Sequence, residues 1–123
     1  MRGGSLLEEI IISNNPKVAE EYQQVRWIEG EVVEVLTTVR DLLHKGHELV
    51  SHPLPPSLNL MSSPVRSVLM TQSQSNKVNS THLEMLESSI HKLELQLNES
   101  GLDHQQLADY ILLDYNFISS ALE

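Results

Sequence analysis

The sequence contains no cysteine, few aromatic residues and few basic residues. Without cysteine the chain forms no disulfide, no Cys-ligated zinc site, no iron–sulfur cluster and no thiol nucleophile. Eight Lys and Arg residues stand against seventeen Asp and Glu residues, which gives a net charge of −9 at pH 7. Nucleic-acid backbones are bound by clustered basic residues. We therefore expect neither cysteine chemistry nor a nucleic-acid partner.

Long hydrophobic runs are also lacking. The apolar runs Ile10–Ile12 and Val68–Met70 are three residues each, whereas a helix that crosses a membrane needs about 20 consecutive apolar residues. A hydrophobic content of 40% in 123 residues suits one domain with one modest core. We expect a cytoplasmic protein without a membrane segment or a signal peptide, formed as a single domain over residues 1–123, with residues 1–7 frayed.

The first part of the chain alternates short β-branched runs with helical patterns. Asn15 before Pro16 is typical of a helix start, and the apolar spacing over residues 31–45, followed by Gly46, predicts a longer helix. Short apolar runs predict four strands, at residues 10–12, 25–28, 47–51 and 67–71. Alternation of this kind favours a three-layer α/β fold with a mainly parallel four-stranded sheet.

Two apolar stripes at helical spacing occupy the C-terminal third. The first consists of Leu83, Leu86, Ile90, Leu93 and Leu97, and the second of Leu107, Ile111, Tyr115, Ile118 and Leu122. Because residues 99–101 interrupt the pattern, we predict a helical hairpin over residues 79–123. The first stripe has two interpretations: it covers the sheet, or it forms a coiled-coil-like interface in a homodimer.

The segment 52–66 carries four of the five prolines and predicts a long loop. Ligands in open α/β sheets collect beyond the carboxyl ends of the strands. The candidate ligand-binding residues near those ends are Asn14, Asn15, His52, Arg66 and Ser67. In this hypothesis Arg66 forms a bidentate pair with a carboxylate or phosphate. The alternative is that the asparagines only cap a helix and that Arg66 pairs with a surface acid.

Three histidines have a spacing that resembles a set of metal ligands, namely His44, His47 and His52. Five extended residues would hold His47 and His52 roughly 16 Å apart, so we predict no metal site, and no motif indicates a cofactor. His52 is the one candidate for acid–base catalysis. Because no established catalytic motif accompanies it, the sequence favours a protein that is not an enzyme without excluding one.

Three segments together resemble the GrdX family: residues 12–16 (ISNNP), 44–54 (HKGHELVSHPL) and 63–69 (SPVRSVL). The resemblance covers residues 9–71. The GrdX family consists of small proteins encoded beside the glycine, sarcosine and betaine reductase systems of anaerobic bacteria that ferment amino acids. The resemblance implies an accessory role near such a reductase, and it assigns no catalytic residue.

Three functional hypotheses follow. The first is an accessory protein that docks to a protein of the reductase complex or holds a small anionic ligand. The second is a small enzyme that uses His52 and Arg66. The third is an assembly module that dimerises through the helix from Leu83 to Leu97.

Overall fold

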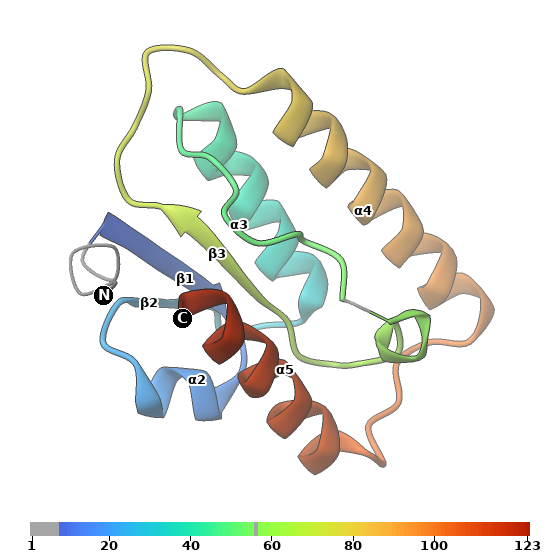
Figure 1. Cartoon of the computed structure of the whole chain (residues 1–123). Coiled ribbons are helices and arrows are strands. Elements are labelled where there is room, and N and C mark those ends of the chain that lie inside the picture. Colours follow the sequence, from blue (N-terminus) through green and yellow to red (C-terminus); the bar gives the residue numbers. More distant parts are fainter. Residues whose placement is uncertain (1–7, 56) are drawn as a thin grey trace.

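The computed structural model describes residues 8–55 and 57–123, so the predicted frayed segment 1–7 lies outside it. Three strands and four α-helices make up the described fold (Figure 1). In chain order they are β1 (Glu9–Ser13), α2 (Pro16–Glu21), β2 (Val25–Trp27), α3 (Val32–His44), the single 3₁₀ turn η1 (Leu58–Leu60), β3 (Ser67–Thr71), α4 (Ser80–Glu99) and α5 (Leu107–Leu122).

The sheet is mixed and has the strand order β2-β1-β3. β1 runs parallel to β2 and antiparallel to β3. The predicted α/β class is confirmed, whereas the prediction of four mainly parallel strands is wrong. Parallel neighbours need a crossover connection, usually helical, and α2 supplies one between β1 and β2. The described residues of the 52–66 loop form no helix except the short turn η1, and β3, which follows this loop, runs antiparallel to β1.

Residues 47–51, predicted as a strand, form only an isolated bridge between Leu49 and Met70. The amides of Val50 and Ser51 both donate to the carbonyl of Leu69, at 2.8 and 3.1 Å. The Leu69 amide in turn donates to the Ser51 hydroxyl at 2.8 Å. A side chain thus takes the place of a backbone partner, which prevents a regular ladder.

Helices cover both faces of the sheet, and alternate residues of the central strand point to opposite faces. Ile12 of β1 packs in a cluster with α3 and α4, whereas Ile11 packs in a second cluster with α2 and α5. Figure 1 shows α5 and α4 as separate helices on either side of the strands. None of the helices in the described part of the chain combines the length and apolar content needed to cross a membrane.

The prediction of a C-terminal helical hairpin is wrong, because the two helices bury their stripes in different places. Leu86, Ile90 and Leu93 of α4 belong to the cluster around α3. Ile118 and Leu122 of α5 belong to the cluster around β1, β3 and α2. An apolar stripe shows that a helix face is buried but does not identify what covers it.

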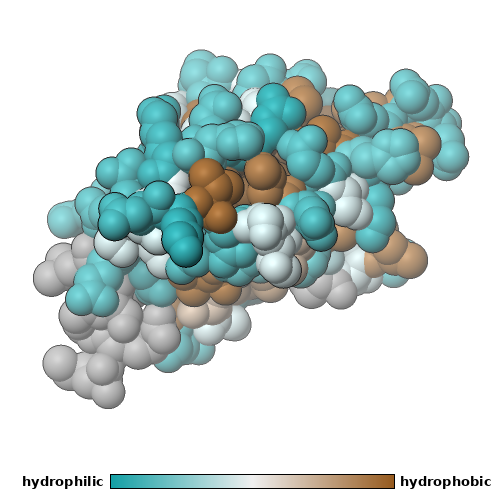
Figure 2. Space-filling view, turned by 90° about the horizontal axis from the view of Figure 1, so that it is seen from above, coloured by the Kyte–Doolittle hydropathy of each residue, from teal (hydrophilic) through white to brown (hydrophobic). Residues whose placement is uncertain are grey.

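This burial also decides between the two interpretations of the α4 stripe. The central part of the stripe, from Leu86 to Leu93, is the inner face of the helix, and only its end at Leu97 is substantially exposed. Seen from above, hydrophobic residues form small areas among hydrophilic ones (Figure 2). The stripe therefore covers the core, and the homodimer stays a prediction.

Candidate functional site

Four of the five predicted site residues meet where β1 ends and β3 begins. The antiparallel register pairs Ser13 with Ser67, which brings Asn14 and Asn15 beside Arg66. All four residues are buried, with exposed fractions of 8% or less. These four residues therefore lie together as predicted, although β1 and β3 are antiparallel and not parallel.

Asn14 uses all of its amide groups on the backbone. Its Oδ1 accepts from the Arg66 amide at 2.8 Å. Its Nδ2 donates to the carbonyls of Gly30 at 3.1 Å and Pro64 at 3.0 Å. Asn14 therefore ties the end of the 52–66 loop to β1 and fixes the backbone at Arg66, and both of its side-chain N–H donors are already used.

Asn15 and Ser67 hold a carboxylate of α5. The Ser67 amide and hydroxyl donate to Asp114 at 3.0 and 2.6 Å. Nδ2 of Asn15 donates to the same carboxylate at 2.9 Å, while its Oδ1 caps α2 by accepting from the Lys17 amide. These contacts dock α5 onto the strand ends, so Asn15 and Ser67 position the site.

Asp114 was not among the site residues predicted from the sequence. Burial raises its pKa, and the hydrogen bonds from Ser67 and Asn15 together with the charge of Arg66 only partly oppose that rise. One signal was present: Asp114 lies three residues after Ile111 and four before Ile118, on the apolar stripe itself. An acidic residue on a buried helix face indicates a partner inside the fold.

Arg66 has the least ordinary environment in the cluster. Its side chain is 3% exposed, and Nη1 donates to the Pro53 carbonyl at 2.8 Å. Nη2 is buried without a hydrogen-bond partner among the residues that the structure describes. Burial lowers the pKa of Arg66 to about 10, and the negative charge of Asp114 partly offsets this effect. The guanidinium is therefore charged at neutral pH and incompletely bonded.

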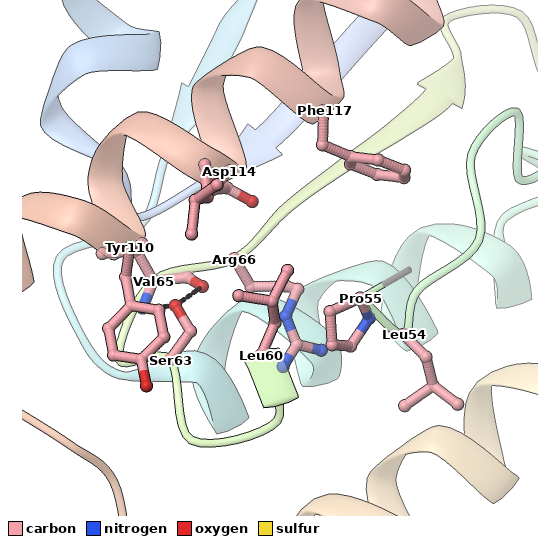
Figure 3. Close-up of a pocket in the computed structure, with 10 residues that line it drawn as sticks. Leu54, Pro55, Leu60, Ser63, Val65, Arg66, Tyr110, Asp114 and Phe117 are labelled. Atoms are coloured by element: carbon pink, nitrogen blue, oxygen red, sulfur yellow. Dashed lines mark hydrogen bonds between the residues drawn. The ribbon is translucent and has the colours of Figure 1, made fainter. Parts of the chain in front are cut away.

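A cavity lies beside this guanidinium, between the 52–66 loop and α5 (Figure 3). It contains about 340 Å³ of space free of protein atoms, part of it open to solvent. In Figure 3 the guanidinium extends away from Asp114 toward Leu60 and Pro55. The lining residues are Leu54, Pro55, Leu60, Ser63, Val65, Arg66, Tyr110, Leu113, Asp114 and Phe117. Apart from Arg66 and Asp114, this wall is mainly apolar.

His52, the predicted catalytic candidate, does not join the cluster. It is exposed and does not line the cavity. Its Nδ1 accepts from the Leu54 amide at 3.0 Å, which stabilises a turn at the start of the loop. Nothing in this geometry directs the imidazole toward a ligand held at Arg66.

The other two histidines serve separate local roles. His44 lies in the last turn of α3, and Nδ1 of His47 lies 2.9 Å from the Thr71 carbonyl. Among the residues that the structure describes, no group of three or more His, Cys, Asp or Glu side chains is placed to hold a metal ion.

The fold and the site together define a small α/β protein with a buried, incompletely bonded arginine beside an apolar cavity. The model of the GrdX-like protein family matches residues 10–123, and the chain belongs to that family. Membership supports, at the level of the family, an accessory protein of the glycine reductase type. Neither the curated proteins nor the solved structures contain a significant match.

Proposed function

We propose that this protein is an accessory factor of the amino-acid reductase systems of anaerobic bacteria, working in the cytoplasm by reversibly binding a small anion at Arg66. The family supports the accessory role. The observation that carries the binding role is Nη2 of Arg66, which is buried without a partner in the described part of the chain. Such a group is costly to leave unsatisfied, and an anion would remove that cost.

Charge and position support the same role. The guanidinium lines the cavity rather than a closed region of the core. Its pKa of about 10 keeps it cationic under ordinary conditions. A hydrogen bond between a guanidinium and an anion is roughly twice as strong as one between neutral groups, so one well-placed arginine supplies much of the affinity for a small ligand.

The 52–66 loop provides the route to Arg66. Among its described residues the helical element is the short turn η1, and the Pro53 carbonyl already bonds to the guanidinium. Because Nη2 is shielded from solvent, the ligand reaches it when the lining residues Leu54, Pro55 and Leu60 shift outward. Segments with few backbone hydrogen bonds open at low free-energy cost.

A thermal-unfolding experiment tests the proposal. The purified protein is heated with acetate, butyrate, phosphate or sulfate at constant ionic strength. We expect at least one anion to raise the Tm of the wild type, because a ligand at 100 times its Kd stabilises the folded state by about 2.7 kcal/mol. The increase should be absent in Arg66→Met.

Arg40→Met is the matched control. Arg40 lies on α3 and pairs only loosely with Glu87, at 3.7 Å, in a partly exposed position. This variant should keep the anion-dependent increase in Tm. If no anion raises the wild-type Tm, or if Arg66→Met retains the full increase, the proposed function is wrong.

A further inference from the structure

The chemistry of the cavity wall restricts which anion fits at Arg66. The first restriction concerns hydrogen-bond donors. Ser63 donates its hydroxyl to the Val65 carbonyl at 2.9 Å, and Tyr110 directs its hydroxyl to Asp103 at 3.4 Å. Arg66 is then the main source of free donors at this wall.

This shortage of donors separates carboxylates from phosphate and sulfate. The two oxygens of a carboxylate match the parallel N–H groups of one guanidinium. Phosphate and sulfate carry further oxygens, each of which would face apolar atoms without a donor and would cost free energy to desolvate. The wall therefore favours a monoanion with two acceptor oxygens.

The second restriction concerns positive charge on the ligand. Asp114 lines the cavity but already accepts three hydrogen bonds, two from Ser67 and one from Asn15. All three bonds come from residues at the strand ends, and they fix the position of α5. The carboxylate serves the fold, so an ammonium group in the cavity would compete with Ser67 and Asn15 for its oxygens.

The third restriction concerns shape. The remaining wall consists of Leu54, Pro55, Leu60, Val65, Leu113 and Phe117. These side chains come from two segments, the loop and α5, that face each other across the cavity (Figure 3). A short hydrocarbon tail between them would bury apolar surface on both sides. The enclosed part of the cavity is small, about 20 Å³, so the tail is limited to a few carbon atoms and lies largely in the solvent-open mouth of the cavity.

We infer that the ligand of this site is a short-chain aliphatic carboxylate, with its carboxylate on Arg66 and its tail between Leu60 and Phe117. This inference rests on the proposed function, since it names the chemical class of the anion bound there. It also distinguishes this site from one for phosphate or for a zwitterion.

Isothermal titration calorimetry with a matched ligand series tests the inference. The series is acetate, propionate, butyrate and pentanoate, compared with phosphate, with the zwitterion 4-aminobutyrate and with the uncharged butyramide. We expect Kd to tighten about fourfold for each added methylene until the tail fills the cavity, which corresponds to the free energy of burying one methylene group. Phosphate, 4-aminobutyrate and butyramide should each bind at least tenfold more weakly than butyrate.

One variant and its control test whether the hydrocarbon tail of the ligand lies in the cavity. Phe117→Ser should weaken the gain per methylene while leaving the Kd for acetate within about twofold, because a carboxylate without a tail does not need that wall. Leu112→Ser, on α5 but outside the cavity lining, is the control and should leave the whole series unchanged.

The outcomes separate the inference from the proposed function. If phosphate binds as tightly as butyrate, or if chain length has no effect while Arg66→Met still abolishes binding, the anion site stands and the carboxylate class is wrong. If 4-aminobutyrate binds more tightly than butyrate, the ligand class is a zwitterion and the inferred class of simple carboxylates is wrong. If no anion binds, both the inference and the proposed function are wrong.

Discussion

In the proposed function, the requirements of folding and of anion binding oppose each other at Arg66. A charged group that is 3% exposed loses its hydration, and one hydrogen bond to Pro53 replaces only part of it. The cost falls on the folded state, while the benefit appears only when an anion binds. Natural proteins commonly accept reduced stability at functional sites for this reason.

The first prediction concerns the stability of Arg66→Met without ligand. Methionine has a similar length and no charge, so the variant no longer bears the cost of burying a guanidinium. Asp114 loses the attraction of Arg66 but keeps its hydrogen bonds from Ser67 and Asn15, so its carboxylate is not left unpaired. The lost hydrogen bond to Pro53 would offset about 1 kcal/mol of that gain. We therefore expect urea unfolding to give a free energy of unfolding equal to or above that of the wild type. A loss of more than about 2 kcal/mol would make Arg66 a structural residue.

The second prediction concerns the pH dependence that Asp114 confers. Burial raises the pKa of Asp114 in the folded protein above the ordinary value of 3.8. At pH values between 3.8 and the raised pKa, Asp114 is protonated in the folded state and ionised in the unfolded state. The contribution of Asp114 to the free energy of unfolding therefore increases as the pH falls through the raised pKa, and it levels off below 3.8.

Urea unfolding of the wild type and Asp114→Asn at pH 7, 6, 5 and 4 measures this contribution. The amide does not titrate, so the stability of the wild type relative to the variant should increase toward pH 4. Asp41→Asn, at an exposed position of α3, controls for the removal of one negative charge elsewhere. A relative stability that stays constant or decreases toward pH 4 would contradict the prediction.

Among the helices, α4 offers a direct comparison of a buried and an exposed leucine only two residues apart. Leu93 is 1% exposed and Leu95 is 46% exposed. We expect Leu93→Ala to lower the free energy of unfolding by about 2–5 kcal/mol, because it removes buried contacts and leaves a cavity. Leu95→Ala should change it by no more than about 0.5 kcal/mol. Comparable losses in both variants would mean that the outer face of α4 is also covered, as in an oligomer.

The sequence predicted those elements whose determinants are local. Asn15 caps α2 as predicted, and α3 ends at the expected place with Gly46 at a φ of +99°. The α/β class, the inner face of α4 and the grouping of Asn14, Asn15, Arg66 and Ser67 also follow from residue patterns. For the caps and the helix faces a few neighbouring residues contain the information, since capping and periodicity act over one or two turns. The grouping of the four site residues was predicted instead from their positions at the ends of predicted strands.

The features that the sequence did not predict depend on contacts between distant segments. The direction of β3 depends on whether the 52–66 loop forms a helical crossover, and the location of α5 depends on the bonds from Ser67 and Asn15 to Asp114. The cavity is lined by residues far apart in the sequence, from Leu54 in the loop to Phe117 on α5. Local patterns contain no information on such pairings, although the acidic residue on the α5 stripe was a visible signal.

The molecule as a whole has two apolar clusters on opposite faces of one small sheet. β1 contributes Ile12 to one cluster and Ile11 to the other, and β3 contributes Val68 and Leu69 in the same way. Loss of either cluster would expose one face of the shared strands. We therefore expect the two clusters to unfold together, as predicted for a single domain.

Two matched substitutions, one in each cluster, test this cooperativity. Ile90→Val on α4 and Ile118→Val on α5 each remove one buried methylene and should each cost about 0.5–1.5 kcal/mol. Because they lie on opposite faces of the sheet, the double variant should lose the sum of the two costs to within about 0.5 kcal/mol. Amide NMR signals from α4 and α5 should disappear at the same urea concentration in every variant. If Ile118→Val moved the midpoint of α5 alone, the helix would unfold separately, and the cavity at Arg66 would be lost before the α3 and α4 cluster unfolded.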